Sequence, residues 1–381
     1  MATKTKAEAL NEHCSHVLSS VYPVVELILS YLPYRELESL SRVCQLWHGI
    51  VRKLREKRST MSFAAFDGDD LVQGTKSFLN DMYTEPGTVF LFHCNILNEL
   101  LETLILNAED DAGADIISDE EKDKSYGEFV RSLLPCNCNL VALEAGGIVG
   151  TSSDLKEINE MEGEGAVSFL CLPKYNTQSK LEIVTISDSV DLNLVEKSYN
   201  NHQLKACLVF DVDPKFLPKR FGYTLLDEYA VLIAGAYVDN VCTMTDEFLN
   251  MELVSFYGND VKVASVILPP PKSGCNNLKE KTEAAVVKLK KYNLPEKNSF
   301  AFMLACIGRG EGMYGERNVE SSLFHKHFPN TPLVGLFGNG EIGCDFYDCA
   351  SASGCDMKRR KSELPKLFHS YTTILVLVAL T

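Results

Sequence analysis

The sequence carries little positive charge and lacks any apolar run long enough to cross a membrane. Thirty-seven Lys and Arg residues stand against 52 Asp and Glu residues, which gives a formal net charge of −15. Nucleic acids and anionic membranes are therefore disfavoured as partners, because binding them requires a basic face. The run Ile374–Leu380 falls well short of the about 20 residues that a membrane helix needs, and it predicts a buried strand.

A secretion signal is also missing from the beginning of the sequence. Lysines are present there, but Glu8 and Glu12 interrupt the apolar segment that a signal peptide would need. The 13 cysteines are an odd number and stand mostly in apolar runs, a pattern typical of free thiols in a reducing compartment. We therefore expect an intracellular protein.

The cysteines do not have the spacing of a structural zinc site. Cys136 and Cys138 are separated by one residue, and the other candidate set is Cys344, Cys349 and Cys355 together with His369. Structural zinc ligands usually come in pairs separated by two to four residues. The sequence therefore predicts neither a metal site nor a cofactor.

What the sequence does contain begins with a compact helical segment, Pro23–Trp47. Leu27, Ile28 and Leu32 lie at helical spacings, and Pro33 fits the start of a new helix. The pattern predicts three short amphipathic helices. A bundle of roughly 40 residues is near the lower limit of independent stability, so its surplus of apolar side chains indicates a partner protein.

This segment resembles an F-box. The resemblance rests on the proline, the leucines and the V-C-x-x-W ending, which here are Pro23, Glu26, Leu27, Leu32, Pro33, Leu37, Val43, Cys44 and Trp47. It implies that the helices bind a Skp adaptor, which attaches to a cullin, and that the chain itself performs no covalent chemistry. The residues expected to bind the adaptor are Pro23, Leu27, Ile28, Leu32, Pro33, Leu37, Val43 and Trp47. Because some of them must form the core of the bundle, Trp47 in particular is also expected to act through stability.

The remaining sequence alternates short strand patterns with helical patterns and polar loops. This order predicts layered sheets with outer helices and leaves parallel and antiparallel pairing open. The predicted fold class is therefore α+β and multi-domain, a small all-α module followed by a two-part mixed α/β region. The predicted boundaries are a tail at 1–19, the helical module at 20–60, a connector at 61–79, and two parts at 80–245 and 246–381.

Three segments that follow predicted core strands resemble the C-terminal part of FIST domains. They are C-I-G-R-G at Cys306–Gly310, G-N-G-E-I-G at Gly338–Gly343 and F-H-S-Y-T-T at Phe368–Thr373. The A-G-x-x-x-D-N segment Ala234–Asn240 is similar to that family as well. The resemblance implies an F-box protein whose FIST region contacts other molecules.

FIST domains are associated with small ligands, and the glycine-rich turns lie next to polar side chains. The candidate ligand-binding residues are Arg309, Asn339, Glu341 and His369, a set that suits a zwitterion such as an amino acid. The alternative is that the glycines only build tight turns while Arg309 pairs with Glu341.

Two further alternatives are a thiol nucleophile, Cys306 or Cys344 with His369 as base, and a phosphate loop at Gly308–Gly315. The phosphate loop is rejected because it lacks the lysine and hydroxyl ending.

Taken together, the two resemblances imply a non-catalytic substrate receptor of a Skp–cullin–F-box ubiquitin ligase. Its expected partners are the Skp adaptor, cullin through that adaptor, and the proteins to be ubiquitinated and degraded. The alternative function is an intracellular small-ligand sensor coupled to protein partners. The basic cluster Lys358–Lys361 is either a signal for nuclear entry or a solvated charge run. The expected location is both cytoplasmic and nuclear.

Overall fold

A computed structural model describes residues 14–68, 71–94, 97, 125–175, 182–187, 204–213, 219–227, 230–242, 251–271, 277–347 and 365–380. The acidic segment 107–124 and the basic cluster at 358–361 lie outside these residues. In the described part of the chain, no helix is long and apolar enough to cross a membrane.

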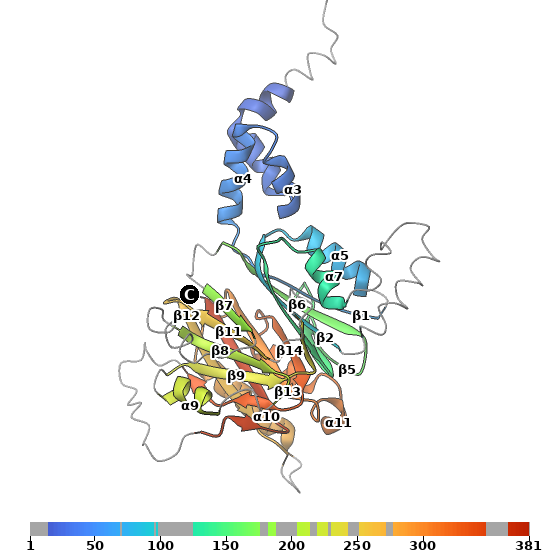
Figure 1. The fold of residues 1–381 in the computed structure, drawn as a ribbon, viewed down its shortest axis with the longest axis vertical. Coiled ribbons are helices and arrows are strands. Elements are labelled where there is room, and N and C mark those ends of the chain that lie inside the picture. The colour runs from blue at the N-terminus through green and yellow to red at the C-terminus, as the bar shows by residue number, and fades with distance from the viewer. Residues whose placement is uncertain are drawn as a thin grey trace, which may run out of the picture.

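Three helices form a small module that projects from the body of the protein (Figure 1). They are α2 (Tyr22–Ser30), α3 (Tyr34–Leu40) and α4 (Gln45–Lys57). Val25, Leu29, Leu37, Ile50 and Leu54 pack together as the core of the module. This core confirms the predicted helical module.

A five-stranded sheet follows, with two helices on its outer face (Figure 1). The strand order is β1 (Ser62–Asp67), β6 (Ala166–Pro173), β2 (Pro86–Cys94), β3 (Asn139–Ala145) and β10 (Asn240–Cys242). The covering helices are α5 (Leu71–Asp81) and α7 (Tyr126–Ser132). Ser125 begins α7 with a capping box, in which its hydroxyl accepts from the Glu128 amide and the Glu128 side chain accepts from the Ser125 amide.

Two larger sheets form the rest of the body. The six-stranded sheet has the order β17 (Phe368–His369), β15 (Glu341–Gly343), β9 (Leu232–Tyr237), β8 (Leu204–Asp211), β11 (Met251–Tyr257) and β7 (Glu182–Ser187). The seven-stranded sheet has the order β16 (Phe346–Tyr347), β12 (Val261–Leu268), β18 (Thr373–Leu380), β13 (Ser299–Cys306), β14 (Leu333–Gly338), β4 (Gly147–Thr151) and β5 (Ile158–Glu162). The helices α10 (Leu278–Lys291) and α12 (Val319–His327) contribute to a core with this sheet. Two further helices are α9 (Lys219–Asp227) and α11 (Glu311–Tyr314).

One large apolar core joins all three sheets. Phe90 of the five-stranded sheet, Leu208 of the six-stranded sheet and Phe302 of the seven-stranded sheet all belong to it. The rings of Phe90 and Phe302 meet edge to face with their centroids 5.2 Å apart. The layered α+β architecture predicted from the sequence is therefore confirmed.

Two predicted boundaries differ from the structure. Residues 61–79 are not a connector, because they form β1 and most of α5. The parts predicted at 80–245 and 246–381 are not separate either, since β8 pairs with β11 and β14 pairs with β4. Strand pairing between residues far apart in the chain decided this outcome, and local patterns carry little information about it.

The open question of strand direction is also answered for the described strands. Three pairs are parallel, namely β2 with β3, β8 with β9 and β13 with β14. Of the other described pairs, all are antiparallel, including β12 with β18 over the full length of the C-terminal strand. The apolar run near the C-terminus is thus the predicted buried strand.

Candidate functional site

The α2 helix carries two apolar stripes, and only one of them faces the module's core. Val25 and Leu29 are buried. On the other side, Val24, Leu27, Ile28 and Tyr31 follow the i, i+3, i+4, i+7 spacing and are 38%, 58%, 44% and 78% exposed. We call these four residues the α2 stripe. An exposed apolar stripe of this kind is typical of a protein-binding surface.

The eight residues predicted to bind an adaptor fall into three classes of exposure. Pro23, Leu27, Ile28 and Val43 are exposed, while Leu32, Pro33 and Trp47 are half-buried. Leu37 is fully buried, so it stabilises the module and has no surface to offer a partner. The Trp47 indole N–H donates to the Leu18 carbonyl at 2.8 Å, which joins α4 to the segment before α2.

Val24 and Tyr31 were missing from the predicted site. Their signal was present in the sequence, because their spacing continues the pattern of Leu27 and Ile28. The prediction counted apolar positions without separating the two sides of the helix.

Arg58 fastens this helical module to the body. Its guanidinium donates to the carbonyls of Leu32 and Ser30 in the module, and to the carbonyl of Tyr83 at 2.7 Å. The same guanidinium lies 3.7 Å from the centre of the Tyr83 ring. Burial lowers the pKa of Arg58 from its ordinary value, an effect that Tyr83 opposes.

Two further contacts cross the same junction. Arg55 of α4 donates to the Glu85 carboxylate, which also accepts from Lys174 at 2.8 Å. The Tyr34 amide donates to the Met82 carbonyl at 3.0 Å, and the Tyr34 side chain is buried in the core beneath α5. Hydrogen bonds, an ion pair and a shared core therefore hold the helical module and the five-stranded sheet together.

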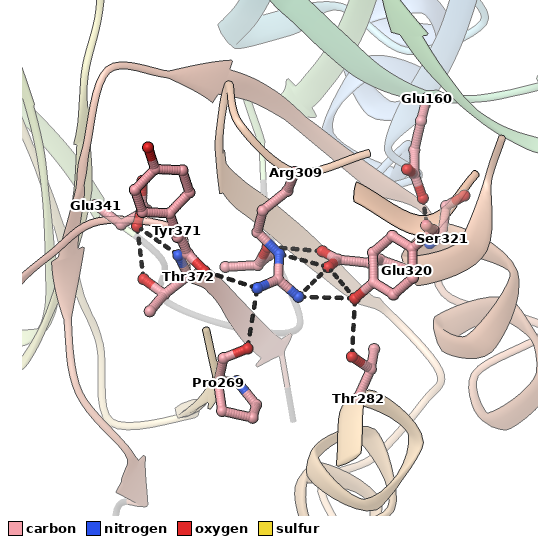
Figure 2. A network of polar contacts seen from close by, with 11 residues as sticks. Glu160, Pro269, Thr282, Arg309, Glu320, Ser321, Glu341, Tyr371 and Thr372 are labelled. Carbon is pink, nitrogen blue, oxygen red and sulfur yellow. Dashed lines mark hydrogen bonds and ion pairs between the residues drawn. The ribbon is translucent and has the colours of Figure 1, made fainter. Parts of the chain in front are cut away.

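A second polar cluster lies where β13 ends, around the predicted ligand residue Arg309 (Figure 2). Arg309 is 1% exposed. Its Nε donates to Glu320 at 2.6 Å, Nη1 donates to the carbonyls of Pro269 and Tyr371, and Nη2 donates to the Tyr314 hydroxyl and pairs with Glu320. These contacts occupy all five N–H donors, which leaves none for a ligand.

The partner of Arg309 differs from the one considered in the sequence. Arg309 pairs with Glu320, a residue of the first turn of α12, and not with Glu341. Glu320 also accepts from Tyr314 at 2.7 Å and from Thr373 at 2.6 Å. Nothing in the spacing identified Glu320, because the contact depends on how α12 packs against the sheet.

Glu341 supports the strained turn before β18 in the same cluster (Figure 2). Its Oε2 accepts from the Thr372 amide at 3.0 Å and from the Thr372 hydroxyl at 2.6 Å. The preceding residue, Tyr371, has a φ of 60°, a left-handed value that is unusual for a bulky side chain. Arg309 and Glu341 thus hold the turn from both sides, since Arg309 binds the Tyr371 carbonyl.

Asn339 and His369, the other two predicted ligand residues, bind neighbouring loops. Asn339 Nδ2 donates to Asp239 at 2.8 Å, and its backbone amide donates to the Tyr237 carbonyl. The His369 Nε2 lies 2.9 Å from the carbonyls of both Gly343 and Lys366. Two cavities of the described residues, of about 290 and 490 Å³, are lined by other side chains.

The thiols near this cluster are poorly placed for nucleophilic chemistry. Burial raises the pKa of Cys306, and the neighbouring Glu341 raises it further. Cys344 is 2% exposed. His369 Nε2 lies beside two carbonyl oxygens, so that nitrogen carries a proton and is not the base that a thiol would need. A neutral, buried thiol is a weak nucleophile.

Comparison with known proteins agrees with this architecture. Residues 22–59 match the F-box domain model, and residues 273–344 match the FIST C domain model. The chain is therefore an F-box protein with a FIST C domain.

Two relatives match nearly the whole chain. F-box only protein 22 from Homo sapiens is 30% identical over 98% of this chain and 96% of its own length. The protein of the same name from Pongo abelii is 29% identical with the same coverage. The chain belongs to the F-box only protein 22 family.

A solved structure of cyanuric acid hydrolase from A. caulinodans is also similar. Its TM-score is 0.33 at 7% identity, and the alignment covers 85% of this chain and 99% of that one. A likeness this weak bears on neither the fold nor the activity of the chain.

Proposed function

We propose that this chain is the substrate-recognition subunit of a Skp–cullin–F-box ubiquitin ligase, which directs client proteins to ubiquitination and proteasomal degradation. The observation that carries the proposal is the α2 stripe, an exposed apolar surface on a module that matches the F-box domain. The full-length similarity to F-box only protein 22 supports it.

The energetics of the α2 stripe favour an adaptor that covers it. Fully burying an exposed Leu or Ile side chain contributes roughly 1.5–3 kcal/mol, and Leu27 and Ile28 still expose 58% and 44% of their surface to water. Tyr31 adds a large ring with a polar hydroxyl, a combination common at interfaces. A complementary apolar groove on a Skp adaptor gains all three contacts in one docking event.

The chain's contribution to ubiquitin transfer is positioning. A client lysine held beside a charged conjugating enzyme reacts in an effectively intramolecular step, which is a large entropic advantage. This geometry requires a fixed distance between the helical module and the body. The contacts of Arg58, Arg55 and Tyr34 at the junction supply such a fixed connection.

The proposal is tested by replacing Leu27 with aspartate in the full-length chain. A charge in the centre of an apolar interface is left desolvated and unpaired, so we expect Leu27→Asp to weaken binding to purified Skp adaptor at least tenfold. Isothermal titration calorimetry measures the affinity. Because Leu27 lies outside the module's core, the midpoint of thermal unfolding stays close to that of the wild type.

The matched control is Val212→Asp, which places the same charge at an exposed apolar residue of the body. Its adaptor affinity remains that of the wild type. Unchanged binding by Leu27→Asp would show that the α2 stripe is not the docking surface.

The location of the complex belongs to the same proposal. We propose that the protein acts in both the cytoplasm and the nucleus, with Lys358–Lys361 as the basic import signal. Deleting this cluster from a fluorescently tagged chain tests the idea, and an unchanged nuclear fraction contradicts it.

A further inference from the structure

A groove of about 290 Å³ lies at the free edge of β1, close to the junction with the helical module. Its residues come from three places in the fold. Phe63 belongs to β1, and Met61 is the residue before that strand. Phe78 and Asp81 come from α5, and Ser153 comes from the turn between β4 and β5. Tyr83, whose ring Arg58 contacts, also lines it. We call this feature the β1 groove.

β1 is an edge strand of the five-stranded sheet. Among the described strands it pairs with β6 alone. The Gly68 amide donates to the Gly165 carbonyl directly opposite, so the antiparallel register makes Phe66, Ala64 and Ser62 the hydrogen-bonded positions. The amides and carbonyls of Phe63, Ala65 and Asp67 therefore point away from β6, toward the free edge.

The side chains along β1 leave this edge accessible. Phe63 and Ala65 turn inward and pack against the large core, while Phe66 packs on the α5 side. The edge between these two faces carries only backbone, and Asp67 at its end is exposed. Alternating backbone donors and acceptors beside a groove are the requirements for adding a strand.

We propose that the β1 groove binds an extended segment of a client protein, which pairs with β1 as an added strand. The inference rests on the proposed function, since it names the surface that takes the client. Main-chain hydrogen bonds to Phe63, Ala65 and Asp67 hold the segment in register. Every second side chain of the segment faces Phe78 and Tyr83, which form the aromatic part of the groove.

Charge defines the chemistry of the segment. Asp81 is the charged residue among the described side chains that line the β1 groove, and Asp67 lies at the far end of the strand. Ser77 donates to Asp81 at 3.0 Å, which fixes that carboxylate on the groove wall. The client segment therefore carries lysine or arginine at positions that face these carboxylates, in agreement with the chain's net charge of −15.

The position of the β1 groove connects client binding to the ligase geometry. Tyr83 lines the groove and also accepts from Arg58 through its carbonyl, and Arg58 binds the end of α2. A segment paired with β1 thus lies beside the junction through which the helical module contacts the body. The distance from client to adaptor is set with few intervening flexible bonds.

The experiment selects short random peptides displayed on phage against the full-length chain without any adaptor. The enriched peptides are then synthesised, labelled and measured by fluorescence anisotropy against two variants. Phe63→Ala and Phe63→Pro both remove the ring, but only proline also removes the amide that points to the free edge. Because the Phe63 amide lies outside the β6 ladder, the proline variant keeps the pairing of β1 with β6.

We expect enriched peptides that carry both apolar and basic residues, and at least tenfold weaker binding by Phe63→Pro than by Phe63→Ala. Both variants bind Skp adaptor like the wild type, which separates this test from that of the α2 stripe. Hydrogen exchange on the wild-type chain is a second measurement independent of folding defects. Bound peptide slows exchange at the amides of Ala65 and Asp67.

Three results would overturn the inference. The first is that no peptide is enriched. The second is that the two variants bind the enriched peptides equally while the amides of Ala65 and Asp67 exchange as fast as they do without peptide. Alternatively, sedimentation reveals a dimer of the chain that Phe63→Pro dissociates, in which case a second copy and not a client occupies the edge.

Discussion

Single buried charged residues hold several loops of the FIST region in one arrangement. Arg309 joins Glu320, Tyr314, Pro269 and Tyr371, which come from different segments of the chain. A buried ion pair of this kind stabilises little on balance, because both charges lose their hydration. Its value lies in specifying one arrangement of these loops, since removing either partner leaves an uncompensated charge.

A second buried carboxylate next to this cluster makes stability depend on pH. Burial, together with the nearby Glu320 carboxylate, raises the pKa of Glu160 to about 7. The folded state therefore holds this proton more tightly than the unfolded chain does. The stabilising contribution is complete below about pH 4.5 and is lost as the pH rises through 7.

We expect Glu160→Gln to remove this pH dependence. The glutamine oxygen still accepts from the Ser321 amide, as Glu160 does at 2.7 Å, but it carries no charge. The wild-type free energy of unfolding falls between pH 5 and pH 7 by more than that of the variant, which urea denaturation at several pH values measures. The control Glu157→Gln changes an exposed carboxylate and keeps the wild-type slope. Parallel curves for wild type and Glu160→Gln would contradict the assignment.

At the scale of elements, α2 performs two tasks with neighbouring residues. Leu29 is 1% exposed in the core of the helical module, while Ile28 is on the α2 stripe. Adjacent positions on a helix are about 100° apart, so a run of apolar residues supplies both surfaces. One helix thereby holds the module together and exposes the α2 stripe.

A matched pair of alanine substitutions separates these tasks. Leu29→Ala creates a cavity in the core and costs the module about 2–5 kcal/mol of unfolding free energy. Ile28→Ala leaves unfolding within about 0.5 kcal/mol of the wild type and weakens adaptor binding instead. Hydrogen exchange of the α2 amides measures the local stability, and calorimetry measures the affinity. The assignment of the two stripes fails if Ile28→Ala loosens the helix as much as Leu29→Ala does.

At the scale of the whole molecule, the junction decides how far the adaptor lies from the FIST body. Arg58 links the two sides of the junction, because it binds carbonyls at the end of α2 and the carbonyl and ring of Tyr83. Figure 1 shows the junction as the narrow connection between the helices and the sheets. A cation near a helix C-terminus also interacts favourably with the negative end of the helix dipole. The junction therefore fixes how the helical module sits on the body.

Arg58→Ala is expected to loosen this connection. Without the guanidinium, the carbonyls of Ser30, Leu32 and Tyr83 lose their donor, and the module moves relative to the body. Small-angle X-ray scattering detects the change as a larger radius of gyration, and ubiquitination of a bound client slows while adaptor affinity stays unchanged. The control is Arg52→Ala, which changes an exposed arginine of α4, the helix that ends just before Arg58. An identical scattering curve for Arg58→Ala and wild type would exclude the role.

The sequence predicted much of the fold and less of the site. Apolar periodicity identified the helical module, and the C-terminal strand was expected at its observed position because burial of a strand requires a local apolar pattern. The connector predicted at 61–79 was wrong, since β1 and α5 are short and carry mixed polarity. The pairing of Arg309 with Glu320 was not predictable, because it joins a strand end to a helix whose position depends on packing.

The sequence by itself determined the class of protein, the apolar surplus of its first helices and the acidic character of its surface. These properties depend on residue types and on spacings within one helix, which folding does not change. Only the tertiary structure decided which of the apolar residues stay in water, that all five donors of Arg309 are occupied, and that β1 is the edge strand of its sheet among the described strands. Each of these depends on contacts between segments far apart in the chain, and such contacts exist only when the whole core has formed.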